Sequence, residues 1–213
     1  MRLPAGTPSY LLASVPEGIK LATQLLDPMP PGQLTRIHNG RHWVASGRVL
    51  RWSPSLRYGM TDLAHNQIRF DANIDLLEPV GAGTPSAGMF IAAGKRTYWL
   101  AGSDPSAFSP IGAHSAGAVP GTETRVPGQA LGLDTDADVT VWLSRHGRYV
   151  MGLPGGAVNG LNPHAAISDA VSGASVFTER DGRRQLITAM RGARPQGLAI
   201  TDRAVAHVVY DGS

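Results

Sequence analysis

Three aspartates spaced two residues apart, Asp134, Asp136 and Asp138, carry the pattern in this sequence that most resembles a metal site. They look like the start of a calcium-binding loop, which also requires glycine at its sixth position and glutamate at its twelfth. This sequence has Val139 and Arg145 at those positions. We therefore interpret the three aspartates as a polar turn that leads into a strand, and not as metal ligands.

The other patterns that could carry catalysis are also incomplete. His38 and His42 are four residues apart, but they flank an Asn-Gly turn and do not share a helix face. No Gly-x-Ser-x-Gly motif marks a nucleophilic serine, and the glycine runs at 81–83 and 152–156 lack the spacing of phosphate-binding loops. The chain has no cysteine, which excludes disulfides and thiolate chemistry. The sequence thus predicts a protein that is not an enzyme, with no catalytic, cofactor-binding or metal-binding residues and no cofactor.

The four tryptophans, Trp43, Trp52, Trp99 and Trp142, all fall in predicted strands. Aromatic side chains fit the surface of a buried sheet well, and they can also form platforms on which sugars stack. We favour packing in a sheet core and keep the sugar platform as the alternative.

The net charge of +3 is carried mostly by arginine, and the density of arginine is highest near the C-terminal end of the sequence. Three acidic residues interrupt this segment, and strand alternation places Arg183 and Arg184 on opposite faces. We favour a solvated or subunit-facing strand, with a nucleic-acid surface as the alternative. The arginines concerned are Arg180, Arg183, Arg184, Arg191, Arg194 and Arg203.

The composition indicates many short strands joined by turns. Of the 213 residues, 26 are glycine and 16 are proline, and they are spread between apolar runs. No apolar run approaches the roughly 20 residues of a membrane-spanning helix, and the N-terminus lacks the pattern of a signal peptide. Charged residues make up only 16% of the chain, which suggests that partners cover part of its surface.

Four hairpins are predicted, within 37–44, 88–104, 139–150 and 174–187, each with a turn that contains glycine. Residues 1–33 are predicted to be an extended lead-in that ends in a proline-rich connector, and residues 34–213 a β-propeller-like domain. We further expect a strand that ends at Pro79, a long surface loop over 103–122, a short helix around His164–Ser168 and a last strand over 204–210.

The segments ASGRVLRWS at 45–53 and AAGKRTYWL at 92–100 resemble each other. The interval from Trp52 to Trp99 is on the order of the 40–50 residues that propeller repeats span. We therefore predict an all-β fold, a propeller-like array of antiparallel hairpins and meanders with about four or five blades by that spacing. The alternative fold is a β-sandwich.

Taken in order, several stretches are similar to the propeller-bearing tail proteins of tailed bacteriophages, of the nozzle or tail-hub type. These stretches are LDPMPPG at 26–32, NGRHWVASGRVLRWS at 39–53, YGM at 58–60, FIAAGKRTYWLAGSDP at 90–105, GAVPGTE at 117–123, VWLSRHGRYVMGLPGG at 141–156 and GASVFTERDGRRQLITAM at 173–190. The resemblance implies a virion structural protein, found in the tail and, during assembly, in the host cytoplasm. It implies identical subunits in a ring, with six-fold symmetry favoured, at the channel through which DNA leaves.

The partners expected on this view are neighbouring tail, connector or fibre proteins, with transient, non-specific contact with DNA and no membrane span. A second hypothesis of a different class is a receptor- or glycan-binding module of a phage tail, in which aromatic side chains stack on sugars.

Overall fold

The computed structural model describes residues 25–102, 104–105, 108–135, 137–161, 167–192, 194–195 and 204–209. This part of the chain is all-β, with several antiparallel sheets, one short 3-10 helix, η2 (Gly128–Leu131), and no α-helix. None of its helices is long and apolar enough to cross a membrane.

Sheet 1 contains β2 (Leu34–His38), β3 (Arg41–Ser46), β4 (Val49–Trp52) and β6 (Gln67–Arg69), hydrogen-bonded in that order. Asn39 and Gly40 join β2 to β3 with φ angles of 48° and 68°. Two successive positive φ values define the turn whose twist matches that of a hairpin, and Asn-Gly adopts it at low cost. The predicted meander over 34–53 is confirmed.

Sheet 2 contains β7 (Ile74–Val80), β8 (Gly88–Ala93), β9 (Arg96–Ala101) and β10 (Ile111–His114). The expectation that a strand ends at Pro79 was wrong, because Pro79 lies inside β7 and pairs with Met89. β7 is an edge strand of its sheet, and an edge strand tolerates a residue that has no N–H to donate.

The expectation of a long surface loop over 103–122 was also wrong. β10 lies in this segment, and Ala116, Ala118 and Val119 are buried. The segment packs closely because its residues are small: a Cβ on Gly117 would lie 2.1 Å from the carbonyl oxygen of Gly94. Small residues that suggested a flexible loop therefore mark a close approach of two backbones.

Sheet 3 contains β11 (Thr124–Pro127), β12 (Asp138–Leu143), β13 (Tyr149–Gly152) and β14 (Val158–Gly160). Sheet 4 contains β16 (Ser172–Arg180), β17 (Arg183–Arg191) and β19 (Ala204–Val209), which confirms the predicted last strand. Two small pairings complete the described fold: β1 (Asp27–Pro28) with β5 (Met60–Thr61), and β15 (Ile167–Ser168) with β18 (Arg194–Pro195).

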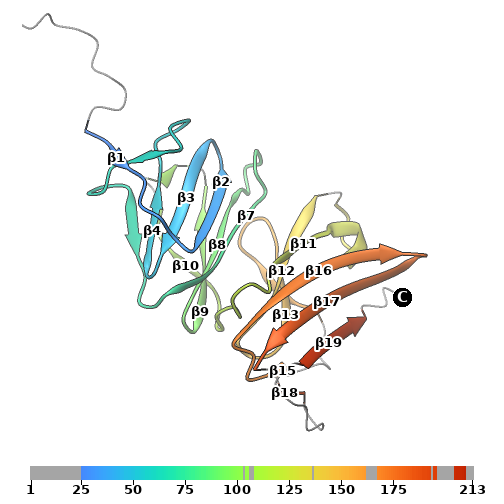
Figure 1. Ribbon diagram of the computed structural model, residues 1–213. Coiled ribbons are helices and arrows are strands. Elements are labelled where there is room, and N and C mark those ends of the chain that lie inside the picture. The colour runs from blue at the N-terminus through green and yellow to red at the C-terminus, as the bar shows by residue number, and fades with distance from the viewer. Residues whose placement is uncertain are drawn as a thin grey trace, which may run out of the picture.

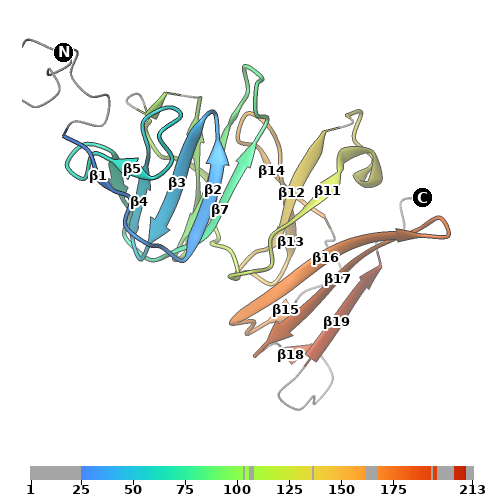
Figure 2. The ribbon, with the colours of Figure 1, turned by 45° about the horizontal axis from the view of Figure 1, so that its top comes forward.

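The four sheets pack face to face in an open row, in the order of the sequence (Figures 1 and 2). Trp43 and Leu50 of sheet 1 meet Ile91 of sheet 2 in one core cluster. Phe90 of sheet 2 meets Trp142 of sheet 3 in a second, and Leu143 of sheet 3 meets Leu186 of sheet 4 in a third. Burial of each large apolar side chain contributes about 1.5–3 kcal/mol, so these shared cores hold the row together.

The all-β, propeller-like fold class is confirmed, and the four predicted hairpins are present. Trp52 and Trp99 each lie on the third strand of a sheet, β4 and β9, so the two segments that resemble each other occupy equivalent places. Sheets 1 and 4 lie at opposite ends of the row (Figure 2). We call the face of each that points away from the row an end face.

Two expectations fall partly or wholly outside the described residues. Ile167 and Ser168 form β15, so they are not helical as expected, and 164–166 lie outside the described part. Residues 1–24 of the lead-in lie outside it too. The connector that follows is extended and pairs at an edge through β1, and the domain boundary near residue 33 remains a prediction.

Candidate functional site

The sequence motifs that could have carried chemistry do not form sites in the described part of the chain. Asp134 and Asp138 are both exposed on either side of a turn, and Asp136 lies outside the described residues. No group of three or more histidine, aspartate or glutamate side chains in the described ranges is placed to hold a metal ion.

His38 and His42 lie on opposite faces of the β2–β3 hairpin, because Ile37 pairs with His42 and His38 pairs with Arg41. Burial, followed by the charge of Arg125, lowers the pKa of His38. The ring of His42 is held by its neighbours: Nε2 lies 2.6 Å from the Thr35 hydroxyl and Nδ1 lies 2.7 Å from the carbonyl oxygen of Tyr58. The two histidines therefore cannot act on one ligand.

The four tryptophans are buried, each with at most 5% of its surface exposed, which confirms their packing in the sheet cores. Trp43 lies against Trp52, with ring centroids 5.5 Å apart, and Phe90 lies against both Trp99 and Trp142. Trp52 also borders a hollow on the surface.

One group of charged side chains joins the first strands of three sheets, and we call it the first-strand cluster: Arg36 on β2, Glu78 on β7, and Glu123 and Arg125 at β11. Arg36 donates hydrogen bonds from Nε and Nη2 to Oε1 of Glu78, with an Nε distance of 2.7 Å. Arg36 Nη2 lies 3.5 Å from Glu123 Oε1, and Arg125 Nε lies 3.8 Å from Glu78 Oε2. The side chain of Glu78 is only 5% exposed.

The first-strand cluster contains two arginines and two glutamates, so its formal charges cancel. The carboxylate of Glu123, however, lacks a hydrogen-bond partner for one of its oxygens, the buried Oε2. Burial, with a smaller contribution from the charge of Glu78, raises the pKa of Glu123. The pairing of Arg36 with Glu78 bridges sheets 1 and 2, and that of Arg125 with Glu78 bridges sheets 2 and 3. We interpret the cluster as a structural clamp.

Sequence reasoning missed this cluster. The sequence held part of the signal. Arg36 comes two residues after Leu34 on the same strand, so both lie on the face of sheet 1 that carries Trp43. A charged residue at an inward position of a strand predicts a buried partner. The partner is 42 residues away and could not be identified without the packing of the sheets.

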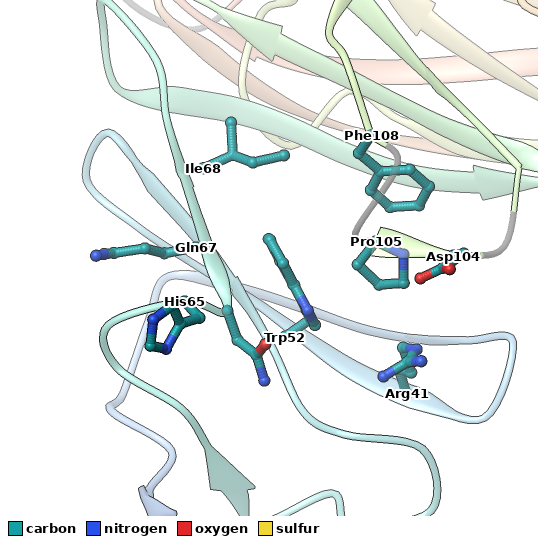
Figure 3. A pocket seen from close by; sticks show the side chains of 9 residues that line it. Arg41, Trp52, His65, Gln67, Ile68, Asp104, Pro105 and Phe108 are labelled. Atoms are coloured by element: carbon teal, nitrogen blue, oxygen red, sulfur yellow. The ribbon is translucent and has the colours of Figure 1, made fainter.

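A hollow of about 440 Å³ lies between the edge of sheet 1 and the segment that follows β9, and we call it the Trp52 pocket. Its lining comes from β3, β4, β6, the turn before β6, and residues 104, 105 and 108 (Figure 3). The lining residues are Arg41, Trp52, His65, Asn66, Gln67, Ile68, Asp104, Pro105 and Phe108.

The Trp52 pocket has an apolar part and a polar rim. Ile68 lies on one side and Pro105 and Phe108 on the other, with Trp52 between them. Arg41 and Asp104 lie near Pro105, whereas the side chain of Gln67 points away from Trp52 (Figure 3). Phe108 is stacked on Trp43 with centroids 5.5 Å apart and planes at 25°, which fixes its ring. Such a lining can bind a small ligand, and it presents no nucleophile paired with a base.

The described part of the chain is thus an all-β row of propeller-like sheets that carries the first-strand cluster and the Trp52 pocket. No protein-family model matches the chain, and no curated protein matches it.

Proposed function

We propose that this protein is a non-enzymatic structural subunit of a bacteriophage tail, of the nozzle or hub type. In this proposal identical subunits form a homo-oligomeric ring, six-fold by preference, at the channel for viral genome ejection. The protein resides in the virion tail and, during assembly, in the host cytoplasm. The resemblance of its hairpin segments to propeller-bearing tail proteins motivates the assignment.

The observation that carries the proposal is the open row of sheets. In such a row the two middle sheets have both faces covered, whereas each terminal sheet keeps one face for something outside the described fold. Exposed apolar side chains occur on both end faces, with Ile37 on sheet 1 exposed to 66% and Val176 on sheet 4 to 56%. Exposed apolar side chains on such faces are typical of contact surfaces in an assembly.

Both end faces are also basic. The strands of sheet 1 contain no aspartate or glutamate, and Arg51 and Arg69 lie on its end face. On sheet 4, Arg180 and Arg183 are cross-strand neighbours on the end face, whereas Glu179 and Arg184 pair on the face toward sheet 3. Two basic faces repel each other, so we expect copies to meet through other surfaces and acidic partners to dock on the end faces.

The loop between β4 and β6 supplies one such other surface. It exposes Leu56 to 73%, and Tyr58 and Leu63 are also exposed. These side chains form no part of the three cores between the sheets, and contact with an adjacent copy would remove them from water.

Electron microscopy of the purified protein, and of particles that contain it, tests the proposal. A six-fold ring on the tail axis is the expected result. A protein that stays monomeric at high concentration and binds no tail component contradicts it.

The Trp52 pocket favours a second candidate, a receptor- or glycan-binding module of a phage tail. This candidate predicts binding of host envelope polysaccharide by the isolated protein. Absence of such binding at millimolar sugar concentration contradicts it, whatever the oligomeric state.

A further inference from the structure

The two end faces of the row differ in how far the chain itself covers them. Val44 lies on the end face of sheet 1 but is only 5% exposed, and a Cβ on Gly32 of the connector would lie 2.5 Å from Val44 Cγ1. On the end face of sheet 4, Val176 is 56% exposed beside its half-buried cross-strand partner Ile187. Figure 2 shows this face of β16, β17 and β19 turned away from sheet 3. Sheet 4 thus leaves apolar side chains in the middle of its end face uncovered.

Strand alternation arranges the end face of β16 and β17 in three zones. Arg180 and Arg183 lie opposite each other at the tip of the hairpin, and the exposed Arg191 lies at the far end of β17. Small and apolar side chains lie between these two ends, namely Ala174, Val176, Ile187 and Ala189. Neither strand places an aspartate or glutamate on this face. The face therefore has an apolar middle between two cationic ends.

A hollow of about 420 Å³ lies at the tip of the β16–β17 hairpin, and we call it the tip hollow. Its lining residues are Thr178, Arg180, Asp181, Arg183 and Gln185. Thr178 pairs with Gln185 and Arg180 pairs with Arg183, so these four side chains share one face. Two guanidinium groups, a hydroxyl and an amide supply hydrogen-bond donors there, against a single carboxylate. Such a lining suits a carboxylate or another oxyanion.

The two arginines of the tip hollow form a like-charge pair. Like charges directly opposite each other destabilise a pair of strands. The carboxylate of Asp181 compensates little, because its Oδ2 lies 3.8 Å from Arg180 Nε and the two side chains are 89% and 90% exposed. On the other face of the same hairpin, Glu179 lies opposite Arg184 and pairs with it. An anionic group bound between Arg180 and Arg183 would offset the repulsion between them.

The dimensions of the end face fit one α-helix. Arg183 and Arg191 are eight positions apart on β17, which at about 3.3 Å per residue is roughly 26 Å, the length of about 17 helical residues. The three strands of sheet 4 span roughly 10 Å, close to the diameter of a helix. An added strand would pair with a sheet edge and leave this face uncovered. A phosphate backbone contacts cations and would leave Val176 and Ile187 without an apolar partner.

We propose that the end face of sheet 4 docks an acidic amphipathic α-helix of a neighbouring tail protein. The apolar stripe of the helix covers Val176 and Ile187. Carboxylates near one end of the helix enter the tip hollow between Arg180 and Arg183, and carboxylates near the other end meet Arg191. This inference rests on the proposed function, because it names the chemistry of one partner in the tail. It does not depend on the Trp52 pocket.

Fluorescence anisotropy tests the proposal on the full chain. The probe is a labelled, designed helical peptide of about 18 residues, with leucine and alanine along one face and glutamates at both ends. It should bind with a dissociation constant on the order of 100 μM, as expected of a small interface. A second peptide of the same charge with proline at its centre should bind at least about tenfold more weakly, because proline breaks the helix.

Arg183→Glu should weaken binding of the acidic peptide at least about tenfold, because it replaces attraction by repulsion. Its thermal unfolding midpoint should not fall, because the change also removes the like-charge pair. Arg96→Glu is the matched control: Arg96 is exposed and directly follows the two-residue turn of the β8–β9 hairpin in sheet 2, as Arg183 does in sheet 4. It should bind the peptide like the unmodified protein. Val176→Thr tests the apolar middle without a change of charge, and should weaken binding about threefold.

The proposal is overturned if the acidic peptide does not bind, if the proline peptide binds equally well, or if Val176→Thr leaves binding unchanged. It is also overturned if Arg183→Glu and Arg96→Glu weaken binding equally, or if duplex DNA of about 20 base pairs binds more tightly than the peptide. A six-fold ring on the tail axis with no peptide binding refutes this inference and leaves the tail assignment intact. Peptide binding by a protein that forms no ring and joins no tail refutes the tail assignment and leaves the docking face.

Discussion

At the scale of residues, the charged groups of the first-strand cluster show how burial and pairing act in opposite directions. Glu78 is almost fully buried, yet it contacts two guanidinium groups, whereas Glu123 is buried with one oxygen unsatisfied. A buried charge is tolerated when it is paired and costs stability when it is not. The two carboxylates should therefore respond differently to neutralisation.

We expect Glu123→Gln to stabilise the protein near pH 8. The folded state raises the pKa of Glu123 above its ordinary value near 4.5, so the folded state binds the proton more tightly than the unfolded state. The contribution of this group to stability is thus greatest when it is protonated and falls as the pH rises through the raised pKa. Urea unfolding at pH 4 and pH 8 should show a gain for the variant only at the higher pH. An equal gain at both pH values would contradict the assigned role of burial.

Glu78→Gln should destabilise the protein by about 3 kcal/mol, the lower end of the cost of breaking a buried ion pair, because Arg36 is partly exposed. Asp75→Asn is the control on the same strand, β7, since Asp75 pairs with Arg145 at 2.8 Å in a more exposed setting. It should cost less than about 1 kcal/mol. Urea unfolding measures both, and similar losses would show that the first-strand cluster is not a clamp.

At the scale of elements, the contact between neighbouring sheets depends on glycine at particular strand positions. Gly152 on β13 faces sheet 2, and a Cβ there would lie 2.5 Å from Phe90 Cε2 and 2.8 Å from Trp142 Cζ3. A Cβ placed on Gly160, on the neighbouring β14, would have no heavy atom within 4 Å. Close packing between the sheets therefore requires glycine at 152 and does not require it at 160.

Gly152→Ala should cost about 1–3 kcal/mol, because the added methyl group overpacks the core between sheets 2 and 3. Gly160→Ala should be neutral or stabilise by up to about 1 kcal/mol, because it only restricts the unfolded chain. Thermal unfolding distinguishes the two. A larger loss for Gly160→Ala would mean that the sheets do not meet at Gly152 as described.

The β16–β17 hairpin offers a test of strand register. Arg180 lies directly opposite Arg183, and Glu179 lies opposite Arg184. Like charges directly opposite each other destabilise a pair of strands, and opposite charges stabilise it. Arg183→Glu should therefore raise the thermal unfolding midpoint slightly and Arg184→Glu should lower it. A shift of one residue in register would exchange the two outcomes.

At the scale of the whole molecule, the row of sheets is open and basic at both ends. If acidic partners dock on the end faces as proposed, their attachment is electrostatic and should weaken with salt, because the screening length falls from about 10 Å at 0.1 M to about 3 Å at 1 M. In sedimentation of a reconstituted tail complex, we expect acidic neighbours to dissociate first as sodium chloride is raised, and contacts between copies to persist. Loss of the copies before the neighbours would contradict this arrangement of surfaces.

Much of the local structure was predictable because it is encoded by local chemistry. Asn39-Gly40 and Asp181-Gly182 both have positive φ at the two turn positions, and each joins the two strands that the sequence indicated. The tryptophans lie in strand cores because large aromatic side chains gain most from burial there. The all-β class and the repeated hairpins follow from these signals alone.

Only the tertiary structure decided which residues meet. The partnership of Arg36 with Glu78, and the meeting of Ile68 with Phe108 around one hollow, join segments about 40 residues apart. The same holds for Ala116 and Ala118, whose small size indicated a loop and proved to allow close packing. Turn chemistry acts between neighbours along the chain and is legible in sequence. The pairing of buried charges and the lining of a pocket depend on how sheets stack, which no short segment determines.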